Sequence, residues 1–169
     1  MYLNETDCVY ADAAWSASSS YHFTSGTSDD SLRFVTNNDN DFNITQSGTG
    51  NITIASSASI SNTGGRATVD FDTNSGNITI DGTLDLDAGA ACSSCDMTFD
   101  ASNGGNIVIT GTVASKRDLD INMNAATNTG TVTFNGANIS MADDLEINTD
   151  SDGSSITITN STINYGGGL

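Results

Sequence analysis

Short segments in which apolar and polar residues alternate recur along the chain from residue 40 to residue 169. The clearest have the form Ile-x-Ile, and their first apolar residues lie 26, 29, 25 and 24 residues apart. Alternation with a period of two indicates a β-strand with one buried face, and most of these apolar residues are β-branched or aromatic, as strands prefer. The first apolar residues of the five segments are Ile52, Ile78, Ile107, Val132 and Ile156.

Two further alternating segments accompany each Ile-x-Ile segment. The segment that precedes it begins at Phe42, Val69, Met97, Leu119 and Leu145. The segment that follows it is centred on Ile60, Leu84, Val113, Ile139 and Ile163. Each repeat therefore contains three alternating segments, and corresponding segments in successive repeats form three columns with one irregular period. This pattern predicts three short strands per repeat with sharp corners between them.

Glycine ends the turn ahead of each Ile-x-Ile segment, and we expect it to supply the positive φ of a sharp corner. These glycines are Gly50, Gly76, Gly105, Gly130 and Gly153. Proline is absent from the chain, so no strand loses a backbone donor.

The repeat predicts an all-β protein, a parallel β-helix (β-solenoid) of about five to six three-strand rungs stacked about 4.8 Å apart. An antiparallel β-sandwich is the alternative, but it predicts no column-by-column register between successive blocks. We expect residues 1–20 to form an N-terminal cap and residues 21–169 the repeat domain. We also expect the first apolar residues of the five Ile-x-Ile segments to lie in a single buried row.

Two blocks carry a family resemblance: GNITIDGTL at residues 76–84 and GNIVITGTV at residues 105–113. They resemble rungs of secreted right-handed parallel β-helix proteins, the bacterial haemagglutinin-type adhesins and autotransporter passengers. The resemblance lies in the repeat pattern and covers residues 40 to 169. It implies a structural or adhesive module that is extracellular or on the cell surface.

The net charge of the chain limits the kinds of molecule that it is expected to bind. The chain of 169 residues has 21 acidic and 4 basic residues and a net charge of −17. A chain of this charge is not expected to bind nucleic-acid phosphates or anionic membranes. No run approaches 18 consecutive apolar residues, so membrane insertion is not expected either.

Carboxylates gather on the outer positions of the strands that precede the Ile-x-Ile segments. Stacked on successive rungs they would stand about 5 Å apart and repel, so counter-ions or Ca²⁺ would stabilise the fold. The alternative is an acidic face that only keeps the protein soluble. No certain cofactor is predicted. The candidate Ca²⁺ ligands are Asp70, Asp72, Asp96, Asp100, Asp118, Asp120, Asp144 and Glu146.

The outer positions of the Ile-x-Ile strands predict a flat Asn/Thr face whose side chains hydrogen-bond along the column. It is either a solvated strand face or a recognition surface for glycans or ice. Its threonines are Thr53, Thr79, Thr133 and Thr157. Asn-x-Ser/Thr sequences make candidate glycosylation acceptors of Asn4, Asn43, Asn51, Asn77, Asn138 and Asn160.

Two of the three cysteines, Cys92 and Cys95, lie in the longest predicted corner. A redox motif or half of a zinc site would need a helix start or a second ligand pair, so we expect a structural disulfide in an oxidising compartment. Cys8 is left over, and it can pair with one of these two or with another subunit.

No nucleophile–histidine–acid set can be argued from the sequence, and we expect the chain not to be an enzyme. The function we expect is an extracellular structural or adhesive module that stacks head to tail with copies of itself into a surface filament. The alternatives are a glycan- or surface-binding segment of a larger secreted adhesin and a polysaccharide-degrading β-helix enzyme.

Overall fold

A computed structural model of the chain describes residues 21–23, 32–36, 42–46, 49–62, 68–86, 96–123, 129–149 and 153–166. Every regular element in these ranges is a β-strand. Within the same ranges no helix has the length and apolarity needed to cross a bilayer. The cap expected over residues 1–20 lies outside the described residues.

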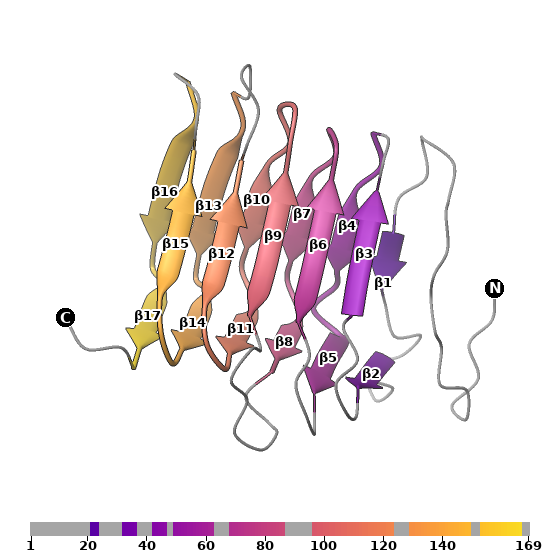
Figure 1. Ribbon diagram of the computed structural model, residues 1–169, viewed down its shortest axis with the longest axis vertical. Coiled ribbons are helices and arrows are strands. Elements are labelled where there is room, and N and C mark those ends of the chain that lie inside the picture. The colour runs from indigo at the N-terminus through magenta and orange to yellow at the C-terminus, as the bar shows by residue number, and fades with distance from the viewer. Residues whose placement is uncertain are drawn as a thin grey trace.

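The strands form three parallel sheets that run side by side along the molecule (Figure 1). Sheet A contains β1 (Tyr21–Phe23), β4 (Ile52–Ile54), β7 (Ile78–Ile80), β10 (Ile107–Ile109), β13 (Thr131–Asn135) and β16 (Ser155–Thr159). Sheet B contains β2 (Leu32–Thr36), β5 (Ala58–Asn62), β8 (Thr83–Asp85), β11 (Thr112–Ser115), β14 (Asn138–Met141) and β17 (Thr162–Tyr165). Sheet C contains β3 (Phe42–Gln46), β6 (Val69–Thr73), β9 (Met97–Ala101), β12 (Leu119–Asn122) and β15 (Leu145–Asn148).

The chain visits sheets A, B and C in turn, so each rung has three strands and each strand pairs with its counterpart one rung away. This confirms the predicted β-solenoid with its three-strand rungs. It excludes the β-sandwich, because every strand pairing in the described residues is parallel.

The predicted columns are in register. In sheet A, Ile52 pairs with Ile78, Ile78 with Ile107, Ile107 with Val132, and Val132 with Ile156. The first four are fully buried, but Ile156 is 46% exposed. The expectation of one buried row is therefore wrong at its last member. Ile156 lies in the row, but β16 is the last described strand of sheet A, so none of the described strands covers it on its outer side.

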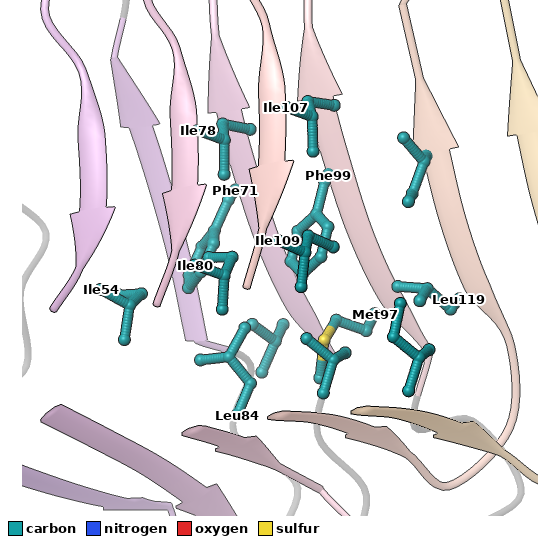
Figure 2. Close-up of a cluster of buried hydrophobic side chains, with 14 of the residues drawn as sticks. Ile54, Phe71, Ile78, Ile80, Leu84, Met97, Phe99, Ile107, Ile109 and Leu119 are labelled. Atoms are coloured by element: carbon teal, nitrogen blue, oxygen red, sulfur yellow. The ribbon is translucent and has the colours of Figure 1, made fainter. Parts of the chain in front are cut away.

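The core is a thin column of side chains enclosed by the three sheets. Strands alternate between buried and partly exposed residues, as in β6 and β9. Figure 2 shows Phe71 and Phe99 from sheet C beside Ile78 and Ile107 from sheet A. The two phenyl rings stack across neighbouring rungs with centroids 5.6 Å apart. Each rung thus buries its apolar face both between its own strands and against the neighbouring rungs.

The corner glycines are required for a reason other than the one expected. A positive φ is found at Gly153 (137°), as predicted, but not at Gly76 or Gly105. A Cβ on Gly76 would overlap the carbonyl oxygen of Gly50 one rung away, and a Cβ on Gly105 would overlap that of Gly76. Stacked backbones approach so closely at this corner that only hydrogen fits.

Candidate functional site

The asparagines at the start of the sheet A strands form a ladder along the stack. The backbone N–H of Asn77 donates to Oδ1 of Asn51 (2.8 Å), that of Asn106 to Oδ1 of Asn77 (2.9 Å), and that of Thr131 to Oδ1 of Asn106 (2.9 Å). The Asn106 amide and the Thr131 hydroxyl add side-chain bonds of 3.0 Å to the same oxygens. The expected hydrogen bonding along this column is confirmed, and it ties each rung to the next.

The threonines of the same face have a different environment. Thr53, Thr79, Thr133 and Thr157 occupy one column, which Val108 interrupts. The hydroxyls of Thr79, Thr133 and Thr157 make no hydrogen bond within the described part of the chain. The asparagine side chains are therefore used in hydrogen bonds between rungs, whereas the threonine column presents free hydroxyls to solvent.

The acidic side chains of sheet C fall into three columns. Asp96, Asp118 and Asp144 directly precede β9, β12 and β15, so one column holds carboxylates on three consecutive rungs. The next column runs Asp70, Thr98, Asp120 and Glu146. The last runs Asp72, Asp100, Asn122 and Asn148. Neutral residues thus occur in two of the three columns, so carboxylates do not stack on every pair of successive rungs.

Two carboxyl groups in these columns have raised pKa values. For Asp72 the main cause is burial, followed by the charges of Asp100 and Asp70, and the pKa is raised from its ordinary value of 3.8. Burial is also the main cause for Asp120, followed by the charges of Asp118 and Glu146. Both causes disfavour the ionised form, so the acidic face destabilises the folded state at neutral pH.

Arg117 partly offsets this repulsion. Its Nε donates to Oδ2 of Asp143 (3.1 Å), and its terminal nitrogens lie 3.5 Å from Asp118 and 3.9 Å from Asp96. The Asp96 oxygen in question is buried and has no hydrogen-bond partner. One guanidinium thus contacts carboxylates on three successive rungs, at the corners that lead into β9, β12 and β15, and partly neutralises them.

Within the described ranges, no group of three or more His, Cys, Asp or Glu side chains is arranged to hold a metal ion. The acidic face is therefore an extended charged surface, and Ca²⁺ binding to it remains a prediction.

The remaining candidates are divided between described and undescribed parts. Cys8, Cys92, Cys95 and Asn4 lie outside the described residues. Among the sequons, Asn43, Asn138 and Asn160 are exposed. Asn51 and Asn77 are half-buried, and their oxygens belong to the ladder, so they are less accessible acceptors.

The end of the stack formed by β16 and β17 differs from the other rungs in its exposed apolar side chains. Ile156 (46%), Ile158 (49%) and Tyr165 (51%) are the exposed large apolar residues of the described chain. Val132 and Phe134, the counterparts of Ile156 and Ile158 one rung inward, are fully buried, and Met141, the counterpart of Tyr165, is also buried. We call this surface the open end, meaning residues 155–159 and 162–165. It combines uncovered apolar side chains with a strand edge in each of two sheets.

Comparisons with models of protein families, with curated proteins and with solved structures found no match.

Proposed function

We propose that the protein is a structural or adhesive β-solenoid module, extracellular or on the cell surface, that assembles end to end into a filament. The observation that carries this proposal is the half-exposed apolar row at the open end. A rung without a neighbour loses the contacts that stabilise every other rung, so covering it is favourable. The repeat pattern shared with secreted adhesins supports the location.

The apolar side chains of the open end allow an estimate of the free energy of association. Covering a half-exposed Ile or Tyr side chain contributes about 1 kcal/mol. Ile156, Ile158 and Tyr165 together thus contribute about 3 kcal/mol, or roughly a hundredfold in the association constant. Backbone pairing along β16 and β17 adds to this, and the loss of rotational and translational freedom opposes it. Assembly should therefore depend strongly on protein concentration.

The test is negative-stain electron microscopy and sedimentation velocity of the purified protein over a range of concentrations. Filaments that lengthen with concentration are expected. The variant Ile156→Asp should stay monomeric, because it places a charge in the contact. Asn138→Asp, which adds the same charge at an exposed position one rung inward from the open end, should assemble normally. Dispersed particles at every concentration would refute self-assembly.

Glycan or surface binding is the second candidate, and the free hydroxyls of Thr79, Thr133 and Thr157 favour it. A glycan array with the monomeric Ile156→Asp protein tests it. Replacing Thr79 and Thr133 by Val should abolish any binding that uses this column. A screen on acidic polysaccharides tests the enzyme alternative, and release of reducing ends would reject a purely structural function.

A further inference from the structure

We propose that Asn103 is a modification site, where spontaneous deamidation converts the asparagine to aspartate and isoaspartate, and that the fold protects Asn135 from the same reaction. The pair Asn-Gly occurs at residues 103–104 and 135–136 and nowhere else in the sequence. All four residues are exposed. The reaction needs no partner molecule, so it is independent of the proposed self-assembly.

Deamidation at an Asn-Gly pair begins when the backbone nitrogen of the glycine attacks Cγ of the asparagine. The new C–N bond closes a succinimide ring, the bond from Cγ to Nδ2 breaks, the glycine nitrogen loses its proton to solvent, and Nδ2 takes up a proton and leaves as ammonia. Water then adds to either ring carbonyl, which opens the ring to aspartate or to isoaspartate. Glycine favours the attack because no side chain hinders its nitrogen. A hydrogen bond from the glycine N–H opposes the attack, because that bond must break first.

Asn103 and Gly104 form the tip of an open turn between β9 and β10. Their φ values are 52° and 95°, and the N–H of Gly105 donates to the carbonyl of Ser102 (3.3 Å), so the turn is of type I′, which prefers Asn-Gly. The N–H of Gly104 makes no hydrogen bond within the described residues. A Cβ on Gly104 would meet nothing within 4 Å. Only the long turn bond and an exposed bond from Nδ2 of Asn103 to Oδ1 of Asn74 hold the described part of this turn against the rotation that cyclisation needs.

At Asn135 the following rung holds the same pair of residues. The N–H of Gly136 donates to the carbonyl of Thr159 (3.0 Å), and the hydroxyl of Thr159 donates to Oδ1 of Asn135 (3.2 Å). The nitrogen that would attack is therefore already hydrogen-bonded. Gly136 also has a positive φ (71°) and open space where a Cβ would lie, so the two sites differ chiefly in this hydrogen bonding.

The products would disturb the corner where the stacked backbones approach most closely. Aspartate at position 103 cannot donate to Asn74, and it adds a negative charge to a chain whose net charge is already −17. Isoaspartate also inserts a methylene group into the main chain close to Gly105, where a Cβ would overlap the carbonyl oxygen of Gly76.

Mass spectrometry of the aged protein tests the proposal. Trypsin separates the two sites, because Lys116 and Arg117 lie between them. The purified protein is incubated at mildly alkaline pH, folded in buffer or unfolded in guanidinium chloride, and electron-transfer fragmentation then measures aspartate and isoaspartate at each position. A sample digested without incubation gives the background. The unfolded sample is the matched control, since both Asn-Gly pairs then react without the fold. The variant Asn103→Gln, which keeps an amide but cyclises poorly, should lose the signal at that position.

In the folded protein Asn103 should convert at least about tenfold faster than Asn135, whereas in the unfolded chain the two rates should agree within about threefold. Both aspartate and isoaspartate should form at Asn103, because they come from one ring. Equal rates in the folded protein, or a faster reaction at Asn135, would overturn the proposal, and so would an Asn103 that reacts only in guanidinium chloride. Aspartate without isoaspartate would also overturn it, because direct hydrolysis of the amide does not pass through the ring.

Discussion

A buried position in the middle of one row and the exposed position at its end allow a matched test of the stack. Ile107 and Ile156 occupy the same sheet A column, and each is an isoleucine in a parallel strand. Ile107 lies between covering rungs and is fully buried, whereas Ile156 is covered on one side and 46% exposed. Replacing each by Ala removes the same atoms from positions that differ chiefly in the presence of a covering rung.

The magnitudes follow from that difference. The substitution removes carbon groups worth about 0.8 kcal/mol each when buried, which gives about 2.4 kcal/mol at Ile107. A cavity closed on all sides raises this to about 3–4 kcal/mol. At Ile156 the substitution loses roughly half of this transfer free energy, because the side chain is about half exposed, and it leaves no enclosed cavity. The loss there is therefore about 1 kcal/mol.

Urea denaturation followed by circular dichroism, at a concentration where sedimentation shows monomers, measures both losses. Ile107→Ala should cost about three times as much free energy of unfolding as Ile156→Ala. At assembling concentrations the cost of Ile156→Ala should rise toward that of Ile107→Ala, because a second copy then covers the side chain. Equal losses in the monomer would refute the argument that neighbouring rungs supply the stability of each rung.

Four further outcomes are expected. Gly76→Ala should destabilise by about 3 kcal/mol or more in the same assay, since its Cβ overlaps the Gly50 carbonyl, whereas Gly136→Ala should cost about 1 kcal/mol, because its Cβ meets open space and only its φ of 71° is strained. Asn77→Ala should cost about 1–3 kcal/mol through the lost ladder acceptor, against about zero for the exposed Asn138→Ala. Because the pKa of Asp120 is raised in the folded state, that state binds the proton more tightly than the unfolded chain. The melting temperature of wild type relative to Asp120→Asn should therefore rise as pH falls from 7 toward 3.8. NaCl and CaCl₂ at equal ionic strength should raise the melting temperature equally if the acidic face is only screened, and a larger effect of CaCl₂, reversed by EDTA, would show that it binds Ca²⁺.

The sequence predicts the architecture because a solenoid repeats one local rule. Alternation with a period of two fixes which residues face inward, and the spacing of Ile78 and Ile107 fixes which of them lie side by side. A shift of one residue would turn every apolar side chain outward, so the register follows from the pattern once the strands are known. The same reasoning places Asp120 beside Glu146 on the outer face of sheet C.

Other features depend on distances between rungs, which a one-dimensional pattern does not contain. The glycine at position 76 is visible in the sequence, but its cause is the Gly50 carbonyl, 26 residues away. The three carboxylates around Arg117 likewise meet only when the corner is folded. The exposure of Ile156 escapes the pattern because the residue itself looks like any other member of its column.

The three sheets differ in the charge of their outer side chains, and this difference affects assembly. Sheet A is held along the stack by neutral amides such as Asn77, and sheet B carries mostly small neutral residues on its outer positions. The stacked carboxylates are concentrated on sheet C, where repulsion acts along the direction in which the rungs are stacked. In the described residues sheet C has five strands and sheets A and B have six each, because sheet C begins at β3. We therefore expect contacts between copies to be favoured along sheets A and B and opposed by the carboxylates of sheet C.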